Sequence, residues 1–340
     1  MCSSDLDRSS TVIRIVGAGA WGTALAILWS ASDAREPVEL VAHTAKEAAR
    51  LTAERTNTRR LPSAPFPERL AVRSLEEVLP NLAATDILVL AVPSDAIVDA
   101  LRSAARGEAT LVLASKGLDA SGSRVSEAAL AGGSPSKSVL VLSGPNLAVE
   151  VALGKPAAAV LAGALSLGEH AQQLLARPNF RLYLSGDRTG VEIGGALKNV
   201  IAIAVSAVRS LGYGENAAAA LLSRGVAEMA RLAEAAGGKR ETVFGLAGVG
   251  DLALTASNTG SRNARLGELL ANGIELKAAV TQIGATLEGI PTAHGALALA
   301  ARLGVELPIT ATVVAALASG VPINVLAQTL LGRAPAPEFR

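Results

Sequence analysis

One glycine-rich segment near the N-terminus constrains the fold more than any other. Thr11–Ala26 has the sequence TVIRIVGAGAWGTALA, in which a short β-branched run precedes Gly17, Gly19 and Gly22. This G-x-G-x-x-G spacing, between an expected strand and an expected helix, is typical of dinucleotide-binding βα units. The glycines permit a tight turn, close approach of a pyrophosphate and close helix–strand packing, and the helix N-terminus attracts phosphates. An ordinary glycine-rich βα turn is the alternative.

Later segments extend this unit into a larger sheet. Apolar runs that alternate with helical patterns predict a doubly wound, mainly parallel sheet of Rossmann type. The loops after its strands should share one rim, where ligands bind; they are Gly17–Gly22, Pro93–Ser94, Ser115–Gly117 and Ser143–Asn146. Leu51–Pro67, with three prolines, is expected to be a surface loop. The expected strands after the first are Val38–Ala42, Asp86–Val92, Thr110–Ala114, Val139–Leu142, Ala157–Leu161 and Phe180–Leu184.

The second half of the chain has a different pattern. From Val191 onward helical spacing is punctuated by glycine, and strand alternation is not apparent. We therefore predict an α/β dinucleotide-binding domain over 11–190 and an all-helical substrate-binding and catalytic domain over 191–335. The expected helices are Val191–Leu211, Ala217–Ala236, Arg262–Ala271, Leu276–Ile283, Thr292–Leu303 and Thr310–Ala318.

Composition excludes several classes of protein. The 340 residues suffice for two domains, and a net charge of +1 creates no field that would recruit nucleic acid. Apolar runs such as Ile201–Val205 are far shorter than the roughly 20 residues of a membrane span. The only cysteine, Cys2, excludes an intrachain disulfide, and the polar segment Met1–Ser10 lacks a signal-peptide core. We expect a cytoplasmic protein and assign no metal-binding residue.

Three segments of the helical half carry candidate chemistry. Lys198 lies in the apolar sequence GGALKNVIAI, where burial would lower its pKa and suit it to proton transfer; a lysine that reaches solvent from a buried stem is the alternative. Asp251 ends the glycine-rich turn GLAGVGDL and can present a carboxylate to that ammonium group, or simply cap the next helix. Thr259–Asn263, TGSRN, precedes a helix, so its N–H groups and the Arg262 guanidinium can bind a phosphate, although a plain N-cap is the alternative.

The sequence does not decide whether the cofactor carries a phosphate on its ribose 2′-oxygen. In NAD-specific enzymes an acidic residue usually closes the second strand and binds the ribose 2′-hydroxyl. Here Glu39 stands near the strand's beginning, whereas His43 and Lys46 follow its end and could lie near a 2′-phosphate. NAD and NADP both remain open.

In order along the chain, these motifs resemble a known family. They are GAGAWGTALA, VPS, ASKGL, SGPNLA, GGALKN, GLAGVGDL, GSRN, LEG and LPIT. Over residues 12–333 the chain is similar to the bacterial-type NAD(P)-dependent glycerol-3-phosphate dehydrogenases. The resemblance implies reversible, NAD(P)H-dependent reduction of dihydroxyacetone phosphate to sn-glycerol 3-phosphate, which supplies glycerophospholipid synthesis. It also implies a homodimer.

The resemblance also implies roles for individual residues. Lys198 would exchange the proton of the C2 hydroxyl, Lys116 would contact cofactor and substrate, and Asp251 would lie beside both Lys198 and the substrate. The substrate would be held by Lys116, Gly144, Asn146, Lys198, Asp251, Ser261, Arg262 and Asn263. The cofactor would contact Gly17, Gly19, Ala20, Trp21, Gly22, His43, Pro93, Lys116, Ala148, Arg262 and Glu288.

Four positions depart from the family pattern. Asn146 replaces Ser or Thr, Leu147 replaces Phe, Arg60 occupies an aromatic position and Val41 replaces a frequent Trp. Two other functions stay open at this point. One is a two-domain dehydrogenase of carboxylated hydroxy acids, against which the TGSRN and GLAGVGDL segments argue. The other is a dinucleotide sensor, which would not need Lys198, Asp251 and Arg262 together.

Overall fold

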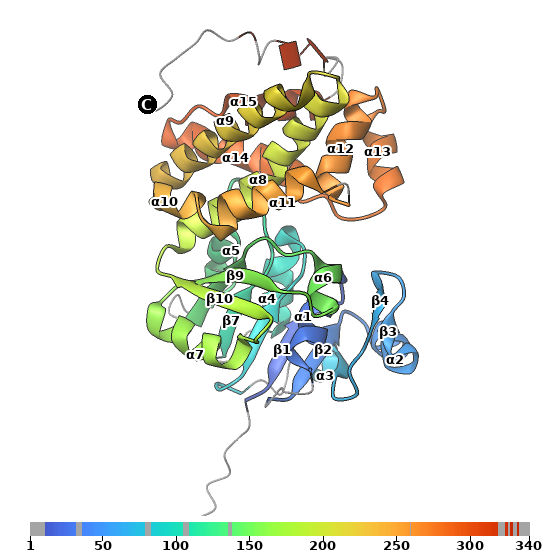
Figure 1. Cartoon of the computed structure of the whole chain (residues 1–340). Helices are drawn as coiled ribbons and strands as arrows, with labels where there is room; N and C mark the ends of the chain where they lie inside the picture. Colours follow the sequence, from blue (N-terminus) through green and yellow to red (C-terminus); the bar gives the residue numbers. More distant parts are fainter. Residues whose placement is uncertain are drawn as a thin grey trace, which may run out of the picture.

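The chain forms a sheet domain with a helical domain at one end of it (Figure 1). The computed structural model describes residues 11–31, 36–78, 83–104, 109–134, 138–258, 260–318, 324–325, 327–328 and 332. The predicted N-terminal tail and Thr259 therefore lie outside the described residues, as does most of the chain after 318.

An eight-stranded sheet forms the first domain, in the order β10-β9-β8-β7-β6-β1-β2-β5. Neighbouring strands are parallel except for β8 and β9, which are antiparallel, so the predicted doubly wound, mainly parallel sheet is confirmed. The strands are β1 (Ile13–Val16), β2 (Val38–Ala42), β5 (Ala71–Ser74), β6 (Ile87–Leu90), β7 (Thr110–Leu113), β8 (Val139–Ser143), β9 (Ala157–Ala162) and β10 (Phe180–Ser185).

Apolar side chains cover both faces of this sheet. All residues of β1, β6 and β7 are buried, as expected of parallel strands between two helical layers. One core contains Ile13, Leu25 and Trp29, and the other contains Val16, Leu90 and Leu101. The helices of this domain are α1 (Ala20–Trp29), α2 (Ala45–Glu54), α3 (Leu75–Val78), α4 (Ile97–Ala104), α5 (Val125–Ala131), α6 (Ala148–Ala152) and α7 (Leu165–Leu175), with a 3₁₀ turn at η2 (Ser94–Ala96).

The segment predicted to be a surface loop is more ordered than expected. Leu51–Pro67 contains the end of α2 and a two-stranded antiparallel hairpin, β3 (Thr56–Asn57) and β4 (Leu61–Pro65). The prediction of a loop is wrong because Pro62 and Pro65 lie exposed on an edge strand, where the missing backbone N–H of proline costs little. The short strand β5 was also missed, since it directly precedes α3 without a turn signal.

The helical domain is built around one long central helix. α8 (Arg188–Ser210) begins at the N-cap Asp187, whose side chain accepts a hydrogen bond from Gly190 N at 2.9 Å. It packs against α9 (Gly214–Ala235), α11 (Asp251–Ser257), α12 (Arg262–Ala271), α14 (Gly289–Leu303) and α15 (Pro308–Leu317). Of the described helices, only α8 is long and apolar enough to cross a membrane, and 94% of its most apolar window is buried inside the protein. α8 is therefore the core of this domain.

The helices predicted for this domain are confirmed within a few residues, but the region between α9 and α12 was misjudged. The glycine-rich segment GLAGVGDL is not a simple turn. It follows α10 (Arg240–Val243) and forms a π-helical turn, η4 (Leu246–Gly250), and the first residues of α11. A Cβ on Gly248 would lie 1.9 Å from the Val243 carbonyl oxygen, so the wide turn closes only because this residue is glycine. α13 (Leu276–Ile283) follows α12.

Both apolar and polar contacts join the two domains. Val191 and Ala247 of the helical domain belong to the same apolar cluster as the sheet residues Leu111 and Val141. The buried carboxylate of Glu192 accepts hydrogen bonds from the backbone N–H and the hydroxyl of Ser126, at 2.8 and 2.7 Å. The interface between the domains therefore contains buried hydrogen bonds beside its apolar contacts, and these bonds fix the orientation of α8 on the sheet domain.

Candidate active site

The three glycines of the loop between β1 and α1 have different structural roles, as expected. Gly17 has a φ of +113°, and a Cβ there would lie 2.6 Å from the Ala91 carbonyl oxygen. A Cβ on Gly22 would lie 2.0 Å from the Gly17 oxygen, whereas a Cβ on Gly19 would meet nothing within 4 Å. Gly17 and Gly22 thus allow tight packing, and Gly19 leaves open space above the helix N-terminus. No side chain caps α1 and its first turn has no acidic residue, so the loop fits an anionic diphosphate.

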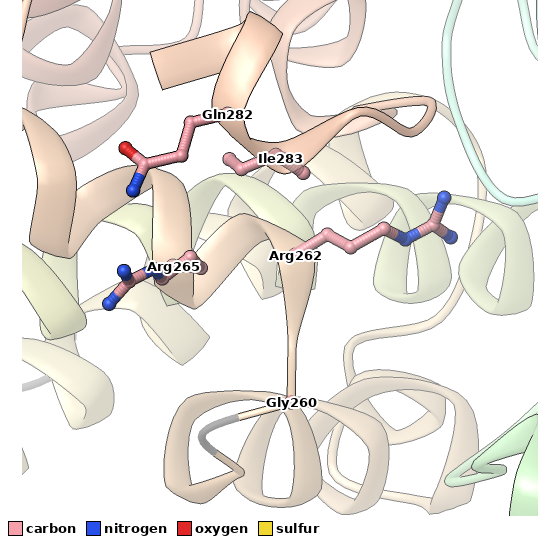
Figure 2. Close-up of a pocket in the computed structure, with 5 residues that line it drawn as sticks. All are labelled: Gly260, Arg262, Arg265, Gln282 and Ile283. Atoms are coloured by element: carbon pink, nitrogen blue, oxygen red, sulfur yellow. The ribbon is translucent and has the colours of Figure 1, made fainter.

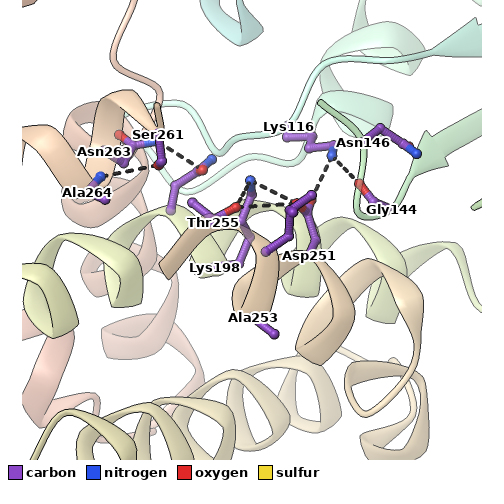
Figure 3. Close-up of polar contacts among 12 residues, drawn as sticks. Lys116, Gly144, Asn146, Lys198, Asp251, Ala253, Thr255, Ser261, Asn263 and Ala264 are labelled. Carbon is purple, nitrogen blue, oxygen red and sulfur yellow. Dashed lines mark hydrogen bonds and ion pairs between the residues drawn. The ribbon is translucent and has the colours of Figure 1, made fainter. Parts of the chain in front are cut away.

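Two lysines from different domains converge on one carboxylate. Lys116, after β7, donates to Asp251 Oδ2 at 2.6 Å and to the Gly144 carbonyl oxygen at 2.8 Å. Lys198, in the middle of α8, lies 3.1 Å from Asp251 Oδ1. Figure 3 shows the three side chains meeting between the rim of the sheet and α8 and α11. All three residues predicted to be catalytic therefore lie together.

Small residues make this convergence possible. A Cβ on Gly195 would lie 2.5 Å from Ser143 Oγ, and one on Gly194 would lie 3.2 Å from the Gly248 Cα. These glycines bring α8 close to the end of β8 on one side and to η4 on the other. The two glycines therefore let the sheet domain and η4 approach the helix just before Lys198.

Burial and charge set the pKa values in this cluster. Burial, countered only in part by Asp251, lowers the pKa of Lys198 to about 8. For Asp251, burial acts to raise the pKa, but the ammonium groups of Lys116 and Lys198 outweigh it and hold the pKa below its ordinary value. Lys198 therefore changes its charge near neutrality while Asp251 stays ionised.

Thr255 completes the site and was not found from the sequence. Its hydroxyl accepts a hydrogen bond from Lys198 Nζ at 2.8 Å and donates to Asp251 Oδ1 at 3.4 Å. Thr255 lies four residues after Asp251, on the same face of α11. The i,i+4 spacing would have indicated it had the sequence after Asp251 been recognised as helical.

The N-terminus of α12 combines a cap with a guanidinium. Ser261 is the N-cap and accepts from Ala264 N at 3.3 Å, so the plain-cap interpretation of this segment is correct as far as it goes. Arg262 is exposed, and one of its nitrogens donates to the Thr286 carbonyl at 2.7 Å. Partial desolvation of the guanidinium, together with the nearby charge of Arg60, lowers the pKa of Arg262 against the opposing charge of Glu288.

Asn263 faces inward rather than toward the rim. Its Nδ2 donates to Asn199 Oδ1 at 2.9 Å, and its Oδ1 accepts from Gly289 N at 3.2 Å. Both asparagines are buried. These bonds connect Asn199, Asn263 and Gly289, which directly follow Lys198, Arg262 and Glu288 in the sequence. Contact of the Asn263 side chain with substrate stays a prediction. The role of Asn199 was also missed.

The remaining predicted residues surround the same rim. Ser94 Oγ donates to Glu288 Oε2 at 2.9 Å, and a Cβ on Gly117 would lie 2.7 Å from that oxygen, so Glu288 lies over the ends of β6 and β7. Burial and the charge of Asp95 raise the pKa of Glu288. Ala20 and Trp21 open α1, Pro93 follows β6, and Ala148 opens α6. Asn146 donates to the Ala158 carbonyl at 3.0 Å and points away from Lys116 in Figure 3.

The end of β2 differs from that of a strict NAD site. Glu39 is held by Arg14 at 2.9 Å and faces Arg73 at 3.6 Å, so its carboxylate is occupied near the strand's beginning. His43, immediately after β2, and Lys46, in the first turn of α2, are exposed.

A pocket of about 360 Å³ borders Arg262 between α12 and α13. Figure 2 shows the guanidinium groups of Arg262 and Arg265 pointing in opposite directions, so they do not converge on one anion. The pocket is lined by Gly260, Arg262, Arg265, Gln282 and Ile283, and it does not include the lysine cluster.

A glycine loop open to a diphosphate, with a buried lysine of lowered pKa facing the same rim, defines a two-domain nicotinamide-dependent dehydrogenase. Comparison with known proteins gives the family. The N-terminal model of NAD-dependent glycerol-3-phosphate dehydrogenase matches residues 12–166, and the C-terminal model matches residues 187–328. The chain belongs to the NAD-dependent glycerol-3-phosphate dehydrogenase family.

Full-length relatives agree with this assignment. Two curated relatives named glycerol-3-phosphate dehydrogenase [NAD(P)+] are 40% identical: that of Halorhodospira halophila over 97% of this chain and 99% of its own length, and that of Thiobacillus denitrificans over 96% and 99%. The crystal structure of glycerol-3-phosphate dehydrogenase from Coxiella burnetii has a TM-score of 0.87 at 35% identity, covering 95% of this chain and 99% of that one. The predicted activity, NAD(P)H-dependent reduction of dihydroxyacetone phosphate to glycerol 3-phosphate, is confirmed.

Proposed function

We propose that Lys198 exchanges the proton of the substrate's C2 oxygen. The observation that carries this proposal is the geometry around Nζ. A protonated lysine has three N–H donors, and Thr255 and Asp251 engage two of them, at 2.8 and 3.1 Å. The third is free for the ketone oxygen of dihydroxyacetone phosphate. In the neutral amine the same two partners hold both hydrogens, so the lone pair is free to accept the hydroxyl proton of sn-glycerol 3-phosphate.

Lys116 and Asp251 support this exchange. Two donors of Lys116 are engaged by Asp251 and Gly144, which leaves one to polarise the same substrate oxygen. Asp251 lies between the two ammonium groups and offsets their repulsion. Without the carboxylate, two positive charges would face each other in a nearly closed site, and the pKa of Lys198 would fall further.

The phosphate end of the substrate is assigned to the N-terminus of α12. Unpaired N–H groups and the helix dipole attract an anion there, and Arg262 adds a guanidinium that can bind two phosphate oxygens. Ser261 and Asn263 shape this helix start, through the cap and through the bond to Asn199 respectively. Gly144 completes the substrate side at the end of β8, and contact of the Asn146 side chain, which is bonded to Ala158, with substrate stays a prediction.

The nicotinamide cofactor supplies the hydride that the reaction transfers. We assign its diphosphate to Gly17, Gly19, Ala20, Trp21 and Gly22, which surround the open space over α1. Pro93, Lys116, Ala148, Arg262 and Glu288 line the rim beyond. Because Glu39 is held by Arg14, the end of β2 presents His43 and Lys46 and admits a 2′-phosphate as well as a hydroxyl.

The wider setting follows from the family. We propose that the enzyme acts as a homodimer in the cytoplasm and supplies glycerol 3-phosphate for glycerophospholipids. We also propose the division into a dinucleotide-binding domain over 11–190 and a helical catalytic domain over 191–335.

Replacement of Lys198 tests the catalytic assignment. Lys198→Met keeps most of the apolar stem but has no proton to exchange, so the turnover of dihydroxyacetone phosphate should fall by about 10³-fold or more while the Kd for NADPH stays within about twofold. Lys155→Met, which removes an exposed ammonium paired with Glu150, is the matched control and should retain full turnover. Normal turnover in Lys198→Met would refute the role.

A further inference from the structure

The β3–β4 hairpin carries one buried polar side chain. Asn57 is 1% exposed, although Thr58, Arg59 and Arg60, which follow it in the hairpin turn, are all exposed. Its Nδ2 donates to the Ala18 carbonyl oxygen and to Thr23 Oγ1, both at 2.9 Å. A carbonyl can only accept, so the orientation of the amide is determined, and both hydrogens of its nitrogen are used.

These two acceptors flank the middle of the glycine loop. Ala18 stands between Gly17 and Gly19, and Thr23 directly follows Gly22 and is fully buried in α1. The hairpin is therefore tied to the loop from outside the βα unit. The donor is the Asn57 side-chain amide, which comes from β3 and not from the loop.

The geometry of the peptide bond gives this contact a consequence. In a planar trans peptide the C=O and the following N–H point in opposite directions. By holding the Ala18 oxygen, Asn57 turns the N–H of Gly19 away from the hairpin. The space beside Gly19 is open, since a Cβ there would meet nothing within 4 Å. The N–H is thus held in one orientation at the start of α1, where an anion would otherwise have to reorient it on binding.

We propose that Asn57 is a positioning residue for the cofactor. It acts through the Ala18–Gly19 peptide, which it keeps aligned for the diphosphate. The inference rests on the proposed placement of the diphosphate over the glycine loop.

The decisive variant is Asn57→Asp, which keeps the shape of the side chain but has no N–H to donate. The carboxylate would face the Ala18 carbonyl and release that peptide. Because the Gly19 N–H would bond to a charged diphosphate, loss of its alignment should raise the KM and Kd for NADPH by about tenfold or more. At saturating NADPH, kcat and the KM for dihydroxyacetone phosphate should stay within about twofold. Thr23→Val, a nearly isosteric change that removes only one acceptor, should raise the NADPH KM by about threefold; it tests the same contact if Asn57→Asp does not fold.

Two further variants make the outcome specific. Arg55 anchors the far end of the hairpin, where it donates to the carbonyls of Pro67, Glu68 and Leu70. Arg55→Met should therefore lower the melting temperature but leave the NADPH KM unchanged. Gly19→Val fills the open space itself and should weaken NADPH binding whatever Asn57 does.

Each result has one meaning. An unchanged NADPH KM in Asn57→Asp and Thr23→Val, with a raised KM in Gly19→Val, overturns the role of Asn57 alone. The same rise in Arg55→Met as in Asn57→Asp also overturns it, because hairpin stability would then be the cause. An unchanged KM in Gly19→Val overturns the placement of the cofactor, and the inference with it.

Discussion

Replacing Asp251 by Asn should move the pH dependence of the enzyme in a defined direction. Asp251 raises the pKa of Lys198 through its charge and hydrogen bond, against the larger effect of burial. At an effective dielectric constant of about 20, unit charges at the 3.1 Å separation of Asp251 and Lys198 attract by about 5 kcal/mol, or almost four pKa units. Asp251 is shared with Lys116, and a nearby opposite charge usually changes a pKa by about one to three. The pKa of Lys198 should therefore fall from about 8 to about 7 or lower.

The assay is the pH profile of kcat/KM in both directions, followed by NAD(P)H absorbance. Reduction of the ketone needs protonated Lys198, so its rate should decline above about pH 8 in the parent enzyme, while oxidation of glycerol 3-phosphate should rise over the same range. In Asp251→Asn both limbs should move to lower pH by about one unit or more.

Two controls isolate the cause. The substrate phosphate titrates near pH 6, and its limb should be the same in every variant. Glu234→Gln makes the same carboxylate-to-amide change in an exposed pair with Arg240, and it should leave both limbs in place. Limbs that stay near pH 8 in Asp251→Asn would refute the coupling between the carboxylate and Lys198.

Three more predictions address other parts of the molecule. Arg262→Ala should raise the KM for dihydroxyacetone phosphate by about 10- to 100-fold through loss of a charged phosphate contact, whereas Arg265→Ala, on the same helix but paired with Glu268, should not; equal KM values would contradict the clamp. Lys46→Glu should raise the KM for NADPH but not for NADH, because a carboxylate at the end of β2 repels a 2′-phosphate; parallel changes would exclude that contact. Burial raises the pKa of Glu228 from 4.5 to about 7, so the free energy of unfolding due to this group is highest below pH 4.5 and falls by about 3 kcal/mol as pH rises through 7. Urea unfolding of Glu228→Gln should lack this dependence, and an unaltered pH profile would contradict it.

Much of the fold was predictable because its signals are local. The β-branched run before Gly17 and the apolar runs at β6, β7 and β8 identify the sheet, and α12 and α13 were predicted to the residue. What could not be predicted depends on contacts between distant segments. The hairpin at Asn57 is held by its bonds to Ala18 and Thr23, and the π-helical turn at Gly248 lies so close to Val243 of α10 that it leaves no room for a Cβ.

The candidate site shows the same division. Lys198 was recognisable as a charge out of place on an apolar helix, and Asp251 followed from the glycine-rich sequence before it. Thr255 and Asn199 carry no comparable signal, since a threonine or asparagine inside a helix is unremarkable until a partner meets it. Asn263 was predicted on the substrate side, but the direction of its side chain is set by Gly289, a residue 26 positions away.

Asp251 is bonded to one lysine from each half of the chain, and this limits how such an enzyme can be taken apart. Expressed alone, the sheet half would display an ammonium group without its counter-ion, and the helical half would retain a carboxylate with only one of its two partners. Exchange of halves between dehydrogenases should therefore succeed only when the incoming sheet presents a lysine after the strand equivalent to β7, at the position that Lys116 has here. The sheet domain and the helical domain therefore have to be inherited or engineered together.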